Sequence, residues 1–330
     1  MQRRRIKSYR IWEKEGNLTS VQIDFLNRYV TGSWTMNPEG FVDVEGDFDC
    51  SSSGIKSLMG IRFGSVGGNF NCSSNQLTSL EGAPEKVGGN FYCTKNQLTS
   101  LKGAPEKVEE NFYCSYNQLT SLEGAPEKVG GNFYCPYNQL TSLEGAPEKV
   151  DGDFHCNKNQ LISLKGAPEK VGWNFYCSYN QLTSLEGAPR EVRWDFYCHE
   201  NQLTSLEGAP REVKRDFDCS SNQLTSLEGA PREVKRDFYC DRNQLTSLEG
   251  APREVRGGFY CESNPISDET MKLICQKMME NPEMGYGAIL ASLQNRIPQE
   301  DWEKLDKSSM EGITDRAKRG YKLLGGIGGI

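Results

Sequence analysis

The chain has 330 residues, with 34 glycines, 14 prolines and a hydrophobic fraction of 36%. A formal net charge of −7 and the lack of an apolar run of about 18 residues predict neither a nucleic-acid partner nor a membrane span. The length allows two or three compact domains, but this composition favours many thin layers over one thick core, which makes a large globular enzyme a poor hypothesis.

The first predicted element is a helix that begins after Thr19. Thr19 and Gln22 have the spacing of a capping box, and apolar residues recur at helical spacing over residues 23–30. Residues 1–44 are therefore expected to form an N-terminal helical cap. The basic residues 3–10 precede no apolar stretch, so no secretory signal is predicted and an intracellular product is expected.

A 21-residue unit then repeats over residues 45–264. Its register is kept by cysteine: Cys72 and every later repeat cysteine up to Cys261 follow one another by 21 residues, and Cys50 precedes Cys72 by 22. The chain thus contains eleven units. A fixed period of about 20 to 29 residues is typical of a solenoid, in which each coil buries its apolar face against its neighbours.

Within one unit, Phe91, Tyr92 and Cys93 alternate with period two, which predicts a short strand with Phe91 and Cys93 inward and Tyr92 outward. An asparagine follows three residues after each cysteine, and we expect it to satisfy backbone groups at the turn. These asparagines are Asn75, Asn96, Asn117, Asn138, Asn159, Asn180, Asn201, Asn222, Asn243 and Asn264.

Phe, Cys, Asn and two Leu of each unit fall at the offsets of the pattern LxxLxLxxNxL, and at this point the chain resembles the leucine-rich repeat family. The stretch NQLTSL with a proline four residues on is similar to the short bacterial type found in secreted effectors. The opening over residues 34–50 and the GAP units are similar to uncharacterised repeat proteins of bacteriophages and bacteria. One departure is Val108, which lies one place before the first Leu of the family, so a shifted or bulged strand is expected.

The resemblance implies an α/β solenoid: a leucine-rich-repeat-like curved parallel β-sheet of about 11 coils, with an irregular, helix-poor convex side and helical caps. Residues 265–330 are expected to form a C-terminal helical cap and a flexible tail. Apolar residues at helical spacing predict one helix around 271–278 and two shorter ones around 286–295 and 298–305. The Gly-rich end, residues 323–330, is the predicted tail.

Metal, cofactor and catalytic chemistry are not predicted. The 12 cysteines include no CxxC pair, and one inward thiol per coil forms a line, whereas zinc needs convergent ligands. We expect reduced core thiols, a reducing cytoplasmic location (a host's cytoplasm included), no metal and no cofactor. The 2 histidines, His155 and His199, lie at outward positions without a recognisable nucleophile, so no enzyme is predicted.

Outward aromatic residues form the candidate site, a protein-binding surface on the concave strand face. They are Tyr92, Tyr113, Tyr134, His155, Tyr176, Tyr197 and Tyr239 in one column, Tyr116, Tyr137 and Tyr179 in a second, and Trp173 and Trp194 beside them. Two alternatives stand. The tyrosines can simply stack as a strand ladder, or the face can bind a glycan, with Asp153, Asn174 and Asp195 as hydrogen-bond partners.

Charged residues change midway along the repeats. The earlier units carry Glu then Lys after the proline, as at Glu106 and Lys107, whereas the last four carry Arg then Glu, as at Arg211 and Glu212. Basic pairs such as Lys214 and Arg215 join them there. This pattern indicates a solvated, densely charged edge.

Overall fold

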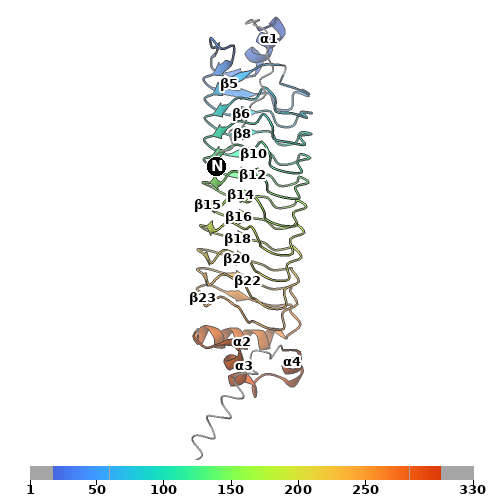
Figure 1. Cartoon of the computed structure of the whole chain (residues 1–330), viewed down its shortest axis with the longest axis vertical. Coiled ribbons are helices and arrows are strands. Elements are labelled where there is room, and N and C mark those ends of the chain that lie inside the picture. The colour runs from blue at the N-terminus through green and yellow to red at the C-terminus, as the bar shows by residue number, and fades with distance from the viewer. Residues whose placement is uncertain (1–17, 59, 282, 306–330) are drawn as a thin grey trace, which may run out of the picture.

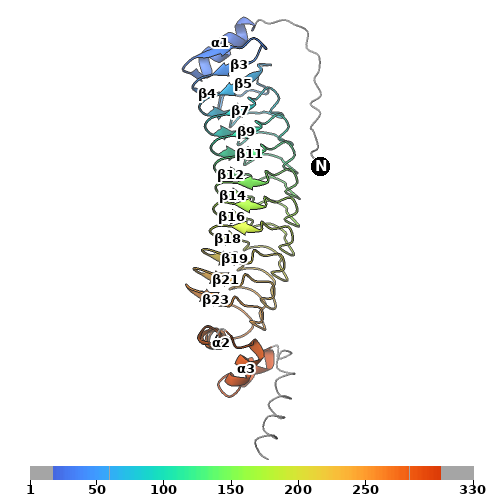
Figure 2. The same ribbon diagram turned by 60° about the vertical axis from the view of Figure 1, so that its left-hand side comes forward.

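The computed structural model describes residues 18–58, 60–281 and 283–305. It is an elongated column of stacked coils with helices at its two ends, and the strands follow one side of the column (Figures 1 and 2). The strands of successive coils pair in parallel, so the predicted leucine-rich-repeat-like solenoid is confirmed. The basic residues 3–10 and the predicted tail 323–330 lie outside the described residues.

Each coil contributes strands to two sheets of twelve strands. The first sheet holds β1 (Val30–Thr31), β4 (Asp47–Asp49), β6 (Phe70–Asn71), β8 (Phe91–Tyr92), β10 (Phe112–Tyr113), β12 (Phe133–Tyr134), β14 (Phe154–His155), β16 (Phe175–Tyr176), β18 (Phe196–Tyr197), β20 (Phe217–Asp218), β22 (Phe238–Tyr239) and β24 (Phe259–Tyr260). The second holds β2 (Trp34–Met36), β3 (Val42–Val44), β5 (Phe63–Val66), β7 (Lys86–Val87), β9 (Lys107–Val108), β11 (Lys128–Val129), β13 (Lys149–Val150), β15 (Lys170–Val171), β17 (Glu191–Val192), β19 (Glu212–Val213), β21 (Glu233–Val234) and β23 (Glu254–Val255).

The break between the two sheets is the shift expected at Val108. Residues 109–111 separate Val108 from Phe112, one residue more than a continuous strand of this repeat pattern needs. The extra residue interrupts the ladder, as a bulge does. The backbone still bonds across coils at this point, since the N–H of Gly130 donates to the carbonyl of Val108 at 3.0 Å.

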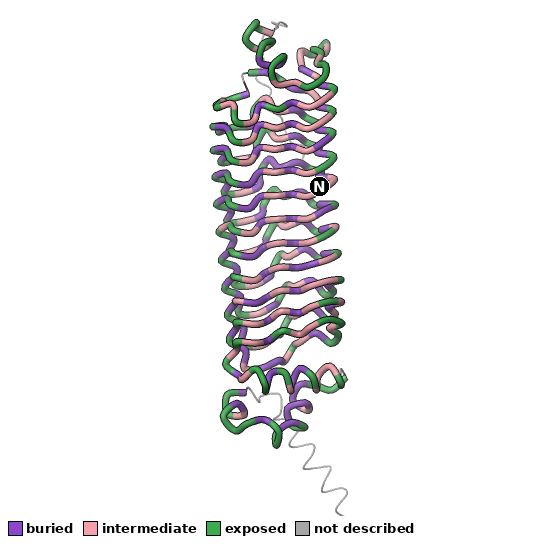
Figure 3. Tube along the Cα trace, turned by 180° about the vertical axis from the view of Figure 1, so that it is seen from behind, coloured by how far each residue is buried: buried purple, intermediate pink, exposed green. Residues whose placement is uncertain are grey.

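The core consists of columns of identical residues. Phe112 and Cys114 are fully buried, whereas Tyr113 between them is half-buried, which confirms the predicted alternation. Successive Phe rings stack along the column, with the centroids of Phe91 and Phe112 5.3 Å apart. In Figure 3 buried segments recur at the same place on every coil. Each buried Phe or Leu contributes about 1.5–3 kcal/mol from burial.

The asparagine column joins neighbouring coils, as predicted. The Nδ2 group of Asn117 donates to the carbonyls of Cys93 and Cys114, both at 3.0 Å. Its Oδ1 atom accepts the N–H of Leu98 at 3.1 Å. One side chain therefore satisfies backbone groups of two coils, and it is 8% exposed. A structural role follows from this geometry.

At the N-terminal end, α1 (Ser20–Tyr29) covers the first coil. Its predicted capping box of Thr19 and Gln22 is confirmed. The helix ends at Tyr29, because the next two residues form β1, which pairs antiparallel with β4. The buried helix residues are Phe25 and Leu26. Ile23, expected on the apolar stripe, is 37% exposed.

At the C-terminal end lie α2 (Asp268–Glu280), α3 (Tyr286–Leu293) and α4 (Gln299–Lys304), which agree with the three predicted helices. The Asp268 carboxylate accepts the N–H of Ser263 in the last coil at 3.1 Å. The Sγ atoms of Cys261 and Cys275 lie 3.5 Å apart, so α2 extends the cysteine column into the cap. Of the helices in the described ranges, none has the length and apolar character to cross a bilayer.

Candidate functional site

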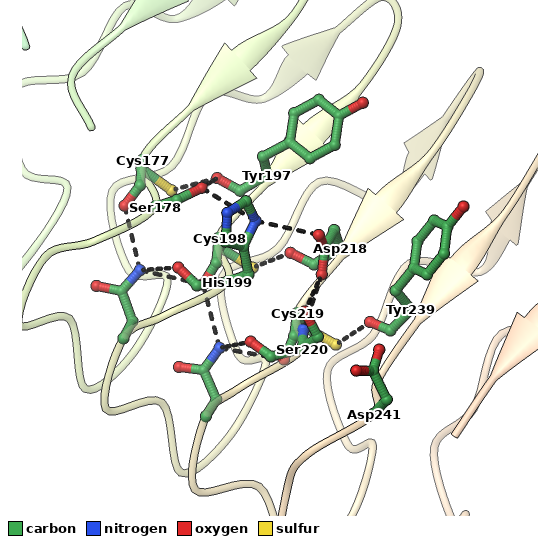
Figure 4. Close-up of polar contacts among 12 residues, drawn as sticks. Cys177, Ser178, Tyr197, Cys198, His199, Asp218, Cys219, Ser220, Tyr239 and Asp241 are labelled. Carbon is green, nitrogen blue, oxygen red and sulfur yellow. Dashed lines mark hydrogen bonds and ion pairs between the residues drawn. The ribbon is translucent and has the colours of Figure 1, made fainter. Parts of the chain in front are cut away.

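Six of the seven residues of the predicted first column, from Tyr92 to Tyr197, form a continuous stack, which we call the tyrosine column. Ring centroids are 4.7 Å apart between Tyr92 and Tyr113, and 4.9 Å between Tyr176 and Tyr197. The rings are almost parallel, so each covers the faces of its neighbours. What remains accessible is a wall of ring edges and hydroxyl groups, and Figure 4 shows the ring of Tyr197 projecting away from the strand.

The phenol groups of this column stay protonated at neutral pH. Burial, with Asp153 and Asp195 nearby, raises the pKa of Tyr176 to about 12. Burial also raises the pKa of Tyr113. The hydroxyl of Tyr134 accepts a hydrogen bond from Nδ2 of Asn132 at 3.0 Å. The column therefore offers neutral hydroxyl groups that can both donate and accept hydrogen bonds.

A second stack, the turn column, lies just beyond the strand ends. Its members share a left-handed backbone conformation, with φ between 55° and 57°; they are Lys95, Tyr116, Tyr137, Lys158 and Tyr179. The rings of Tyr116 and Tyr137 stack at 4.3 Å. The ammonium group of Lys158 lies 4.8 Å from the ring centre of Tyr137 and 5.4 Å from that of Tyr179. These tyrosines are 47%, 41% and 48% exposed, respectively.

The two predicted tryptophans stack on the opposite edge of the tyrosine column. The ring centroids of Trp173 and Trp194 are 5.3 Å apart, and the guanidinium of Arg215 lies 4.7 Å above the Trp194 ring. Trp173, Tyr176 and Tyr179 belong to one coil and mark its three columns. We call the surface made by the tyrosine column, the turn column and this tryptophan pair the tyrosine face.

Most predicted site residues thus lie in adjacent stacks, but Tyr239 is separate. Asp218 occupies the tyrosine position of the intervening coil, and Tyr239 stacks on Tyr260 instead, at 4.7 Å. The continuous part of the tyrosine face therefore ends at Tyr197.

His155 is an integral part of the tyrosine column. Its ring lies 4.4 Å from that of Tyr134 and 4.1 Å from that of Tyr176. Its Nε2 atom is 3.7 Å from the Asp153 carboxylate. The imidazole thus fills the place of a phenol ring.

The structure brings together a serine, a histidine and an aspartate that the sequence did not indicate. Nδ1 of His199 lies 3.2 Å from the hydroxyl of Ser178 and 3.0 Å from the carboxylate of Asp218 (Figure 4). A serine hydrolase needs the two partners on opposite ring nitrogens. Because both contact Nδ1, neither lies on Nε2, and the group lacks the geometry in which histidine takes the serine proton on one nitrogen while aspartate holds the other.

Hydrogen bonds from His199 and Ser220 hold the pKa of Asp218 below its usual range, although burial opposes them as the largest single effect. The Ser220 hydroxyl donates to this carboxylate at 2.6 Å. The cluster links three coils at the place where the tyrosine column is interrupted. At this place, polar contacts between coils take the position that stacked tyrosine rings occupy elsewhere in the column.

A second polar column, which we call the junction column, was missed by the sequence reasoning. In every coil but the last, an Asn or Asp precedes the Phe, and its Oδ1 atom accepts the N–H of the equivalent residue in the next coil. The N–H of Asn174 donates to Oδ1 of Asp153 at 2.9 Å, and the N–H of Asp195 donates to Oδ1 of Asn174 at 3.0 Å. The signal was present, since residues 47 and 69 and every twenty-first residue up to 237 are Asn or Asp. In the last coil the position is Gly258.

The cysteines are buried thiols. All 12 are free, and burial raises the pKa of Cys50 to about 12 and of the inner thiols further. The Sγ atom of Cys114 lies 3.3 Å from the carbonyl of Tyr134, to which it donates. In the part of the chain that the structure describes, no group of three or more His, Cys, Asp or Glu side chains is arranged to hold a metal ion.

The two best-formed cavities of the described residues lie at the C-terminal end, not on the tyrosine face. One, of about 300 Å³, lies between Pro252, Met278 and Tyr286. The other, of about 340 Å³, lies beside Ile266 and Asp301. The tyrosine face is therefore an open surface, a shape that suits a macromolecule better than a small ligand.

No protein-family model matches the sequence, and no curated protein matches it. In fold the chain is similar to YopM, a leucine-rich effector protein from Yersinia pestis, with 21% identity over 67% of this chain and 67% of that one and a TM-score of 0.45. It is also similar to YopM from Yersinia enterocolitica WA-314, with 18% identity over 66% of this chain and 64% of that one and a TM-score of 0.28. The expected similarity to bacteriophage proteins stays a prediction.

Proposed function

We propose that this chain is a non-enzymatic protein-interaction module and that its partner lies on the tyrosine face between β10 and β18. The observation that carries the proposal is the exposure of Tyr116, Tyr179 and Trp173 at both edges of a stacked, rigid column. Tyr and Trp are the side chains that most often dominate binding energy at protein interfaces. Stacking holds their rings in place, so little side-chain entropy is lost on binding.

Truncation of two rings in the centre of the face tests the proposal. We expect the double variant Tyr134→Ala, Tyr176→Ala to capture at least about tenfold less of its partner, a loss of about 1.4 kcal/mol. The measurement is quantitative capture from lysate of the native host, with identification of what is retained. The matched control is Thr141→Ala with Thr183→Ala, two exposed residues of the same coils outside the tyrosine face. Equal capture by both double variants would move the site elsewhere.

Glycan binding on the same face is the alternative proposal, and the geometry favours it less. Sugar rings stack on the faces of aromatic rings, but here those faces cover one another. The expected polar partners Asp153, Asn174 and Asp195 use Oδ1 for the backbone of the next coil. Retention of the chain on a carbohydrate array, lost in the Tyr134→Ala, Tyr176→Ala variant, would favour the glycan.

We further propose that the protein works in a reducing compartment such as a cytoplasm. Buried thiols serve as small apolar core residues, and those from Cys72 to Cys219 donate to a carbonyl of the next coil. Oxidation of any of them would disturb a column that is packed on both sides.

A further inference from the structure

A basic cluster borders the tyrosine face in the coils of β18 and β20. It comprises Arg193 and Trp194, which follow Val192, and Lys214 and Arg215, which follow Val213. Val192 pairs with Val213, so the equivalent residues lie one coil apart. We call these four residues the basic rim.

The cations of the basic rim lack acidic partners. Within the described residues, no carboxylate oxygen lies within 4.0 Å of the charged nitrogens of Arg193, Lys214 or Arg215. The next coil differs, because Lys235 pairs with Glu212 at 2.9 Å and Arg236 lies 3.9 Å from Asp216. The arginines that follow the prolines, such as Arg211 and Arg232, also form no ion pair within the described residues, but none of them lies over an aromatic ring. The basic rim is therefore distinguished by unpaired cations that lie beside an exposed aromatic stack.

The acids nearest in sequence have other partners. Glu191 pairs with Lys170 and Glu212 with Lys235, and the two aspartates belong to the junction column. Oδ1 of Asp195 accepts the N–H of Asp216 at 2.8 Å, and Oδ1 of Asp216 accepts the N–H of Asp237 at 3.1 Å. Asp195 is buried and Asp216 half-buried, whereas Arg193 and Lys214 are exposed. An anion from solvent is therefore more accessible to these two cations than to the two carboxylates.

The backbones that carry these cations are close together, because equivalent residues of adjacent coils are about 4.8 Å apart. The guanidinium of Arg215 rests on the ring of Trp194 at 4.7 Å, which leaves its in-plane N–H groups free for a carboxylate. A paired hydrogen bond of this kind is among the stronger contacts a protein makes.

We propose that the basic rim docks an acidic segment of the protein partner, with carboxylates at Arg193, Lys214 and Arg215 and the segment lying against Trp194. This inference rests on the proposed function, because the rim borders the tyrosine face. The net charge of −7 repels acidic peptides from the chain as a whole. Attraction of such a peptide must therefore be local.

The test uses two fluorescein-labelled peptides, deca-glutamate and deca-lysine, and fluorescence anisotropy with the full chain at low and at physiological salt. The rim variant is Arg193→Glu, Lys214→Glu, Arg215→Glu. The matched control is Arg190→Glu, Arg211→Glu, Arg232→Glu, which makes the same change of charge at exposed positions after the prolines. Circular dichroism checks the fold of each, and Arg215→Ala provides a milder variant.

We expect the deca-glutamate affinity to fall at least about tenfold in the rim variant and less than about twofold in the control. Arg215→Ala should weaken binding by about threefold or more, and salt should weaken it in the unaltered chain. Equal losses in both triple variants, or equal binding of the two peptides by the unaltered chain, would overturn the inference.

The outcome is separable from that of the proposed function. The variant Tyr134→Ala, Tyr176→Ala keeps the basic rim, so it should still bind deca-glutamate. If it also captures partner normally, the tyrosine face is not the site even though the rim binds acids. If it loses the partner while the unaltered chain ignores deca-glutamate, the face stands and the acidic segment is rejected.

Discussion

Replacing Asn117 by alanine tests how the coils are joined. The side chain is buried, donates to the carbonyls of Cys93 and Cys114 and accepts the N–H of Leu98. Alanine removes these contacts, together with a longer one to the Ser115 carbonyl, and puts no polar atom in their place. The buried N–H of Leu98 is then left without a partner, whereas the carbonyls of Cys93 and Cys114 keep the hydrogen bonds from Nδ2 of Asn96 and Asn138.

The stranded N–H costs about 1–3 kcal/mol and each lost hydrogen bond to a carbonyl about 0.5–1.5 kcal/mol, so the free energy of unfolding should fall by about 2–5 kcal/mol. Urea denaturation followed by circular dichroism measures this change, and amide exchange at Leu98 should accelerate. The control is Gln118→Ala, at an exposed residue next in sequence, with a change below about 0.5 kcal/mol. A loss under about 1 kcal/mol for Asn117→Ala would refute the assignment of the asparagine column as the inter-coil joint.

Three further predictions concern backbone fit and titration. Gly130→Ala should lower stability by about 1–3 kcal/mol in urea denaturation, because its Cβ would lie 2.1 Å from the carbonyl oxygen of Glu109. The raised pKa of Tyr176 means that the folded state favours the neutral phenol. Its contribution to stability is therefore complete below pH about 10 and is lost as the pH rises toward about 12. Phenolate absorbance measures this titration. The pKa of Asp218 is lowered, so the contribution of its carboxylate to stability is present above pH about 4 and is lost as the pH falls. The variant His199→Asn should make stability less dependent on pH in that range of an acid-denaturation curve. A Gly130→Ala chain as stable as the original, or phenolate and acid curves without these shifts, would contradict the respective prediction.

The repeat period made the core and the joints predictable. Phe112, Cys114 and Asn117 take the positions that their alternation and spacing indicate, because every coil meets a neighbour of the same sequence. The end of α1 was less predictable. Pairing of Val30 with Phe48, a contact between residues distant in sequence, outweighs the helical pattern there.

Contacts between coils are what reasoning within a single unit missed. Ser178 lies 21 residues before His199, so the two are vertical neighbours, and Asp218 is on the adjacent column of the next coil. The half-burial of Tyr113 arises in the same way, because stacked rings shield one another only once the distance between coils is set. The residue types were visible in the sequence, but their mutual distances were not.

The junction column and the asparagine column give every boundary between coils the same set of bonds, and Gly258 occupies the last position, where no further coil requires an acceptor. A gene duplication or deletion of one whole unit would therefore leave these backbone bonds in place at each remaining boundary. The number of units is then a quantity that evolution can alter in a single recombination event, and the reach of the molecule can grow or shrink without a new core.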